Sequence, residues 1–375
     1  MVHKLIHRSA VLLASVAVIG VAILPTAANA ATTIDGPIGL GAAEPFAVLA
    51  SSTVTAVPAT SPQTRIEGDL GLSPGTATPG YADIDHMGAL HVADATAIDA
   101  QIALTAAYDT AASLTPTQSG LVNLGGSLGP GVYSGDALSV NGALALTGTA
   151  SSVWVFQAAS SLTVADAAAI TVIGGSICNV FWQVGSSATI GTTATMVGTV
   201  MANTSITVNT LATVTGRLLA RTGAVTLDTN TITRPSGCSA TGGTVRTSPT
   251  FTSAAPLAGV EGSDYSYTLT TSGSPTATYT VTSGALPTGL TLDATTGTIS
   301  GRPTTPGTYT FTVTAANGTA PDAVATYTLV IAPDLTPRLA DSGSDPTVPL
   351  LAGGALLAAG MALVLAQRAR TARRR

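Results

Sequence analysis

The stretch that decides the fold runs SSATIGTTATMVGTVMAN (186–203), TSITVNTLATVTGRLLAR (204–221) and TGAVTLDTNTITRP (222–235). The pattern returns after 18 residues. This period is too short for a pair of helices, but it accommodates three short strands with corners, which is one coil of a parallel β-helix. Gly198 and Gly216 fall at the same corner of successive coils, where a residue without Cβ permits a tight bend.

Alternation within the repeat predicts which side chains face outward. In the first strand, Ala188 and Ile190 are expected to stack inside the coil on Ile206 and Val208. The outward residues of this strand are Thr189, Thr207 and Thr226. In the second strand, one outward file comprises Thr195, Thr213 and Thr231, and the next comprises Val197, Thr215 and Thr233. The third strand, 199–202 and 217–220, is apolar on both sides, which predicts that another element covers it.

The expected cover is residues 88–114, GALHVADATAIDAQIALTAAYDTAASL, the one long Ala-rich stretch with helical spacing. A broad apolar face is expected along it. The residues assigned to that face are Leu90, Ala97, Ile98, Ile102, Leu104, Tyr108 and Ala112. The fold class is therefore all-β: a parallel β-helix with one long α-helix alongside.

Composition agrees with an exported β protein and excludes several functions. Charged residues are 9% and aromatic residues 4% of the 375, whereas an average soluble domain is about 25% charged. Seven of the 14 basic residues lie at the two ends, so the middle keeps seven Arg against 19 acidic residues. Because phosphate binding needs clustered basic side chains, nucleic acid is excluded as a partner. His86 and His91 are the histidines beyond the leader, which argues against a catalytic triad or a multi-His metal site.

Both ends of the chain resemble targeting segments. Residues 1–30 have a basic start, an apolar run and the small-residue pattern 28–30 (Ala-Asn-Ala), as in a secretory signal peptide. Residues 348–366 are apolar or small and long enough to span a bilayer. The basic segment 367–375 is expected to stay in the cytoplasm.

A short motif stands just before the apolar segment: Leu339, Ala340, Asp341, Ser342 and Gly343. Together with that segment and the basic tail, it resembles the sorting signal through which a sortase attaches proteins to the cell wall of Gram-positive bacteria. That signal normally carries Thr where this sequence has Ser342. A plain C-terminal membrane anchor is the alternative, and either arrangement displays the protein outside the cell.

The remaining sequence indicates a second domain. A polar linker is expected at 239–250 and a Pro- and Ser-rich stalk at 333–347. Between them, residues 251–332 contain short alternating strands at 265–269, 279–281, 309–313 and 327–330, a spacing typical of a sandwich. The stretch 286–303 with the following GTYTFTVTAANG resembles the immunoglobulin-like modules of bacterial surface proteins, which implies a β-sandwich that acts as a spacer.

Six segments of residues 32–238 point to a family. They are GAAEPFAVLA (41–50), EGDLGLSPG (67–75), LGPGVY (128–133), VWVFQ (153–157), CNVFWQVGSSAT (178–189) and GRLLARTGAVTLD (216–228). In this order they resemble the microbial ice-binding protein family. The resemblance implies a right-handed, discontinuous β-helix that binds ice through one flat face carrying T-(A/G)-x-(T/N) patterns.

The candidate ice-binding residues follow from that pattern and the outward files. They are Thr192, Thr193, Thr195, Thr210, Thr213, Thr215, Thr229, Thr231 and Thr233, with Thr189, Thr207 and Thr226 on the adjacent face in reserve. Outward Thr columns form a grid of hydroxyl and methyl groups that can order water. Cys178 and Cys238 are the two cysteines; in an exported protein they form a disulfide, the alternative being two free thiols.

Two other functions compete with ice binding. Parallel β-helices also serve as polysaccharide lyases and hydrolases, but the acids at 83, 85, 94, 99 and 109 indicate a solvated face rather than an active site. We therefore expect no enzyme, no cofactor and no metal. The stronger alternative is a surface adhesin that binds glycan or protein without ice activity. The prediction is a surface-anchored ice-binding protein whose partners are ice or ordered water, the membrane or wall, and sortase.

Overall fold

The computed structural model describes residues 30–57 and 63–335. The signal peptide, the sorting-like motif and the apolar segment 348–366 lie outside these residues. No helix among the described residues meets the length and apolarity that a membrane span requires.

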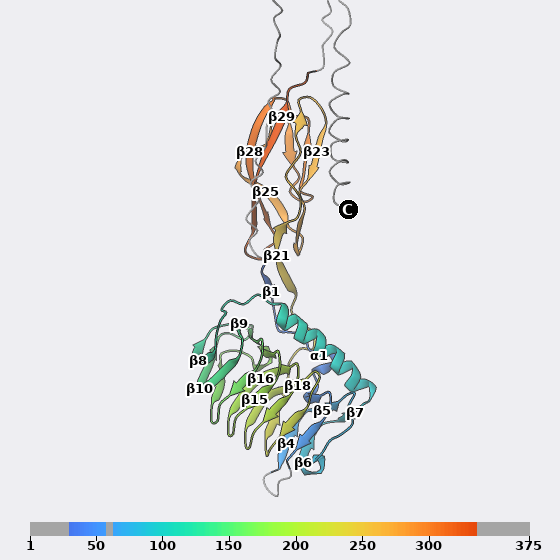
Figure 1. Ribbon diagram of the computed structural model, residues 1–375, viewed down its shortest axis with the longest axis vertical. Coiled ribbons are helices and arrows are strands. Elements are labelled where there is room, and N and C mark those ends of the chain that lie inside the picture. The colour runs from blue at the N-terminus through green and yellow to red at the C-terminus, as the bar shows by residue number, and fades with distance from the viewer. Residues whose placement is uncertain (1–29, 58–62, 336–375) are drawn as a thin grey trace, which may run out of the picture. The chain divides into compact units, whose positions relative to one another are not determined.

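Residues 46–57 and 63–233 contain a parallel β-helix with three faces, which confirms the predicted fold (Figure 1). The first, here called the threonine face, consists of the short strands β12 (Leu162–Val164), β15 (Ala188–Ile190), β17 (Ile206–Val208), β19 (Val225–Leu227) and β3 (Val54–Ala56), with the first half of β10 (Leu138–Thr147) and β8 (Asn123–Leu128). The coils are discontinuous in sequence, because the N-terminal coil containing β3 pairs with the last C-terminal one.

The second face, here called the mixed face, carries polar and charged side chains. It consists of β13 (Ala169–Ile173), the first residues of β16 (Thr195–Ala202) and β18 (Thr213–Ala220), then β20 (Thr231–Thr233), β4 (Thr64–Glu67) and β6 (Ile84–Met87). Strands β16 and β18 turn onto the next face at Gly198 and Gly216. A Cβ on Gly216 would collide with the carbonyl oxygen of Gly198, which explains the glycine at this corner.

The third face, here called the helix face, is covered by α1 (Ala95–Ser113), which runs along it in Figure 1. Its strands are β9 (Gly131–Gly135), β11 (Trp154–Ala158), β14 (Val180–Val184), the second halves of β16 and β18, β2 (Phe46–Ala50), β5 (Asp69–Leu72) and β7 (Leu90–Val92). Phe181, Met201 and Leu219 pack against Leu104 and Tyr108 of the helix. The predicted cover is thus confirmed.

Two details of the predicted helix are wrong. Residues 88–94 do not belong to it: Leu90–Val92 is strand β7, and Asp94 caps the helix by accepting from the Ala97 amide at 2.8 Å. This bond is the main cause of the lowered pKa of Asp94. Ile98 and Ile102, assigned to the buried face, are 47% and 66% exposed. Leu90 and Ala112, assigned to the same face, are also exposed. Ala97, Leu104 and Tyr108 of the predicted face are buried, and the helix also approaches the sheet through Ala100, Ala107 and Ala111.

The interior of the β-helix is a continuous apolar column. Trp154 and Trp182 are fully buried, and Phe156 stacks on the Trp182 ring with centroids 4.0 Å apart. The predicted inward pairs Ala188 on Ile206 and Ile190 on Val208 are also present. In this column, each coil packs closely on the next, and this packing fixes the register of the outward side chains.

The second domain contains the predicted strands and a core of its own. One sheet has the order β22 (Gly259–Val260), β29 (Ala323–Ala332), β28 (Gly307–Ala316) and β25 (Thr278–Gly284), and another joins β23 (Tyr265–Thr268), β27 (Thr298–Gly301) and β26 (Leu290–Leu292). Phe311, Tyr327 and Leu329 lie in the core between them. The stretch 239–250 is not wholly a linker, because β21 (Val245–Phe251) pairs with β1 (Thr32–Ile34) and β24 (Thr271–Ser274).

Candidate functional site

The sequence-predicted file Thr195, Thr213 and Thr231 lies on the mixed face. These three residues are direct register partners on β16, β18 and β20. Their side chains point outward, and the Thr213 hydroxyl lies 3.4 Å from the Thr195 hydroxyl. The neighbouring positions 197, 215 and 233 are also in register, but Val197 is only 6% exposed.

The other candidate residues of the mixed face occupy its corner rather than a strand. Thr193, Leu211 and Thr229 have positive φ angles of 59°, 61° and 53°. The hydroxyls of Thr193 and Thr229 donate to the carbonyl of the preceding residue, and Thr210 donates to the Asp228 carboxylate. Thr192 lies in the same turn, where its amide bonds Asp166. These hydroxyls are already engaged, apart from that of Thr192, and their positions do not continue the grid.

Charged residues end the Thr file on the mixed face. The register partner of Thr231 on β4 is Arg65, and the partner of Arg65 on β6 is Asp85. These two side chains form an ion pair at 2.8 Å. Glu67 follows Thr233 and pairs with the same Arg65 at 2.9 Å. The Thr file of this face therefore spans only three coils, because Ala169 is the register partner of Thr195 at its other end.

The threonine face carries a longer file, which includes the three reserve residues. The register partners run without interruption through Thr163, Thr189, Thr207, Thr226 and Thr55. Ser139 and Asn123 extend the same file beyond Thr163. Parallel strands lie roughly 4.8 Å apart, so this file presents one hydroxyl and one methyl at each such step.

A second file runs beside it, two residues earlier in the chain, at the positions that directly precede each strand. It is formed by Ser161, Ser187, Ser205, Ala224 and Thr53. Alternate residues of an extended chain are roughly 6.7 Å apart, so the two files lie side by side as a two-dimensional grid. In the second file, the Ser187 and Ser205 hydroxyls accept from the backbone amides of Ser205 and Ala224. Within the described residues, none of the five Thr hydroxyls of the main file bonds another protein group. By contrast, Thr312 and Thr326 on the second domain's sheet bond each other at 3.0 Å.

Sequence reasoning missed Thr163 and Thr55 for a reason that lies in the fold. The 18-residue period holds only for the last coils; Thr163 and its partner Thr189 are 26 residues apart. Thr55 belongs to the N-terminal coil, which closes onto the C-terminal one. The available signal was local: the strands SLTV, SATI, SITV, AVTL and TVTA all place Thr at the third position.

The corner geometry leads to a stability prediction at Leu211. A left-handed backbone costs a non-Gly residue roughly 1–2 kcal/mol, and Asn tolerates it better. Leu211 is 47% exposed, so its side chain contributes little packing. We expect Leu211→Asn to raise the free energy of unfolding by about 0.5–1 kcal/mol, measured by denaturant titration. The control is Thr213→Asn, at a position with ordinary strand geometry; an equal gain there would refute the explanation.

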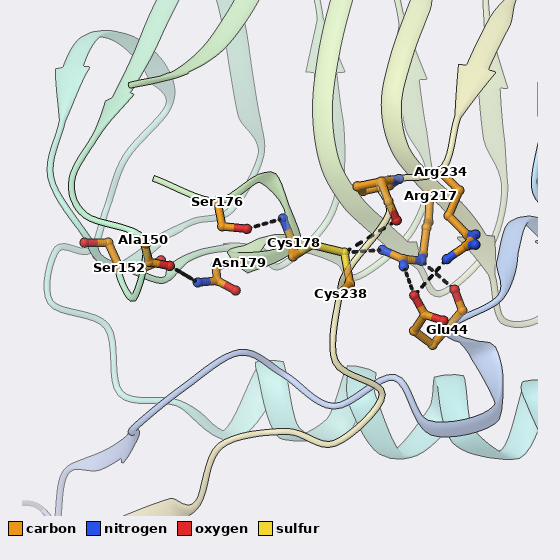
Figure 2. Close-up of a disulfide and its surroundings, with 10 residues drawn as sticks. Glu44, Ala150, Ser152, Ser176, Cys178, Asn179, Arg217, Arg234 and Cys238 are labelled. Atoms are coloured by element: carbon orange, nitrogen blue, oxygen red, sulfur yellow. Dashed lines mark hydrogen bonds and ion pairs between the residues drawn. A yellow bond between two sulfur atoms is a disulfide. The ribbon is translucent and has the colours of Figure 1, made fainter. Parts of the chain in front are cut away.

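Figure 2 shows how the segment after the last coil is fixed to the body. Cys178 and Cys238 form a disulfide, as expected. Beside it, Glu44 accepts from Arg217 at 2.7 Å and from Arg234 at 2.9 Å. Arg217 is 1% exposed; burial lowers its pKa, and the negative charge of Glu44 opposes this shift. The cluster is structural, since each charged group has a partner.

Removing the disulfide should destabilise the β-helix. The bridge closes a 60-residue separation, and bridges of this kind typically contribute about 2–4 kcal/mol. We expect the free energy of unfolding of the double variant Cys178→Ser with Cys238→Ser to fall by about 2–4 kcal/mol. Fluorescence isolates the effect, because both Trp residues lie in the β-helix. The same unfolding midpoint with and without reductant in the wild type would contradict the prediction.

Both histidines of the described residues have structural partners. His86 bonds the Tyr81 hydroxyl and the Gly68 carbonyl, both at 2.9 Å, and His91 bonds Asp94 at 2.8 Å. In the part of the chain that the structure describes, no group of three His, Cys, Asp or Glu side chains could hold a metal ion. The two Thr-bearing faces are therefore the strongest candidates for a functional surface.

Comparison with known proteins places both domains. A profile described as ice-binding-like matches residues 48–233, and an Ig-domain profile matches residues 248–332. An ice-binding protein of Nostoc sp. (strain HG1) is 39% identical over 200 residues, which are 52% of this chain and 72% of the relative. One of Flavobacterium frigoris (strain PS1) is 33% identical over 219 residues, covering 53% and 76%.

Solved structures agree with these matches. The crystal structure of an ice-binding protein from an Antarctic biological consortium has a TM-score of 0.51 at 42% identity and covers 54% of this chain and 92% of its own. That of the ice-binding protein from the Antarctic ascomycete Antarctomyces psychrotrophicus has a TM-score of 0.51 at 39% identity, covering 53% and 100%. The sequence resemblance is thus confirmed, and the chain belongs to the ice-binding-like protein family.

Proposed function

We propose that this protein binds ice, and that the threonine face is the surface that does so. The observation that carries the proposal is the uninterrupted file of five Thr residues in strict register, from Thr163 to Thr55. The family relatives are ice-binding proteins by name, which supports ice as the ligand. The proposed ice contact therefore lies on the threonine face. It does not lie on the neighbouring mixed face, which carries the sequence-predicted candidates Thr195, Thr213 and Thr231.

The physical basis is a rigid grid of weak, repeated interactions. Each Thr offers a hydroxyl that holds an ordered water and a methyl group around which water must arrange itself. The β-branched side chain has a restricted χ1, and the buried column beneath holds the backbone still. Water ordered on such a grid can join a growing crystal, so adsorption needs no bond to be broken. We accordingly propose that the protein performs no catalysis and needs no cofactor.

Growth of single ice crystals in a solution of the purified protein tests the function. Faceted crystals and a gap between the melting and freezing temperatures are the expected result, with a non-binding protein at equal concentration as the control. Round crystals that grow freely below the melting point would refute ice binding and favour the adhesin alternative.

We also propose that the protein is displayed on the outside of its host cell. The disulfide supports this, because such bonds persist in oxidising compartments. Residues 1–30, 339–343 and 348–366 supply the sequence argument, and all but residue 30 lie outside the described part. On intact cells, added protease should remove the protein. Release by wall-digesting enzyme rather than by detergent would indicate sortase attachment, and the reverse a membrane anchor; protection from protease would refute surface display.

A further inference from the structure

A hollow of about 570 Å³ lies beside the C-terminal end of α1. The chain leaves the helix at Leu114, and Pro116 and Gly120 form one wall. The floor consists of outward side chains of the helix face, Ser134 and two glutamines. These floor residues are direct register partners on β9, β11 and β14.

The two glutamines of the floor differ in their bonding. Gln157 donates its amide to the carbonyls of Ala111 and Leu114, at 2.7 and 2.8 Å, and so closes the end of the helix. Gln183 is 7% exposed, yet its side-chain amide bonds no other group among the described residues. Since its side chain lines the hollow, the hollow is where this amide can find a partner.

Packing alone does not require an amide at position 183. The next residue of the same outward file is Met201, followed by Leu219, and the helix covers both. An apolar side chain of similar length would therefore suit the position. The Gln183 amide is not among the buried side-chain atoms left without a partner, so it reaches the hollow, where water or a ligand can bond it.

The chemistry of the lining defines the ligand class. Gln183 offers donors and an acceptor, Ser134 a hydroxyl, and Asp136 a carboxylate, while Leu114 and Pro116 add apolar surface. An anion is disfavoured by Asp136 and by the carbonyl end of the helix. Sugar hydroxyls both donate and accept, and the faces of sugar rings are apolar. We propose that this hollow binds the terminal residue of a neutral carbohydrate.

This site is independent of ice binding, because it shares no residue with the threonine face. Together the two sites would let one domain hold ice on one side and a polysaccharide on another. Either proposal can fail without the other.

The proposal is tested by titrating the 15N-labelled protein with methyl β-glucoside and with methyl N-acetyl-β-glucosaminide. Glycerol, which bears hydroxyls but has no ring, is the control ligand. We expect saturable shifts of the Gln183 side-chain amide signals with a glycoside and none with glycerol. Gln183→Met should weaken binding about tenfold or more while keeping or raising the Tm. Ser134→Ala provides a second variant in case Gln183→Met does not fold.

Thr207→Tyr, which changes no residue that lines the hollow, is the matched control and should bind the glycoside as the wild type does. No saturable shift with either glycoside would overturn the proposal. Equal affinity in the wild type and in the folded floor variants would also overturn it, because the sugar would then bind elsewhere.

Discussion

Replacing Thr207 by Tyr should abolish most of the freezing gap while leaving the fold intact. Thr207 is the middle of the five-residue file, between Thr189 and Thr226. A Tyr ring at this point would stand above its neighbours and hold the grid away from a crystal plane on both sides. A loss of about 1.4 kcal/mol in the free energy of adsorption corresponds to tenfold weaker binding. Because the ring interrupts an extended contact, we expect the variant to bind ice at least tenfold more weakly.

The matched control is Thr213→Tyr, in the same coil but on the mixed face. It adds the same ring to the same kind of strand position, and we expect it to keep most of the activity. Circular dichroism and Tm show whether each variant is folded. Full activity in Thr207→Tyr with loss in Thr213→Tyr would return the site to Thr195, Thr213 and Thr231.

The largest effect on stability is expected from Glu44→Ala. Glu44 is the shared partner of Arg217 and Arg234 (Figure 2). Arg217 is 1% exposed and would remain buried without a counter-charge. Removing one partner of a buried ion pair costs about 3–5 kcal/mol. We therefore expect the unfolding midpoint, followed by Trp fluorescence in denaturant, to fall sharply.

Asp85→Ala is the control for this prediction. Asp85 pairs with Arg65 on the surface of the same β-helix, with side chains 49% and 41% exposed. Exposed pairs contribute about 0–1 kcal/mol, so this variant should unfold close to the wild type. A similar small loss in both variants would show that the Glu44 cluster does not stabilise the protein.

The sequence was sufficient for the fold because the repeat carries its own pattern. Inward Ile206 and Val208, outward Thr207 and the glycine at 216 each have a local physical reason. The covering helix was also predictable, but not its orientation. The helix has apolar residues on all its sides, so periodicity could not distinguish Ile98 and Ile102 from Ala100 and Ala107 as the residues that face the sheet. Close packing against the sheet selects the smaller side chains.

The candidate site was harder to predict than the fold, because it depends on contacts between distant segments. Thr55 joins the file only when the first coil closes on the last, and Arg65 ends the neighbouring file for the same reason. The left-handed corner at Thr193, Leu211 and Thr229 was likewise hidden, since none of these residues is glycine. A residue list drawn from one repeat therefore mixed strand and corner positions.

Adsorption to a single ice crystal tests the central claim most directly. The wild type and Thr207→Tyr, each fused to a fluorescent protein of a different colour, would be frozen slowly onto one crystal from the same solution. The account predicts that the wild-type colour enters the ice on defined planes and that the variant colour stays in the liquid. Both colours in the ice, or neither, would contradict it.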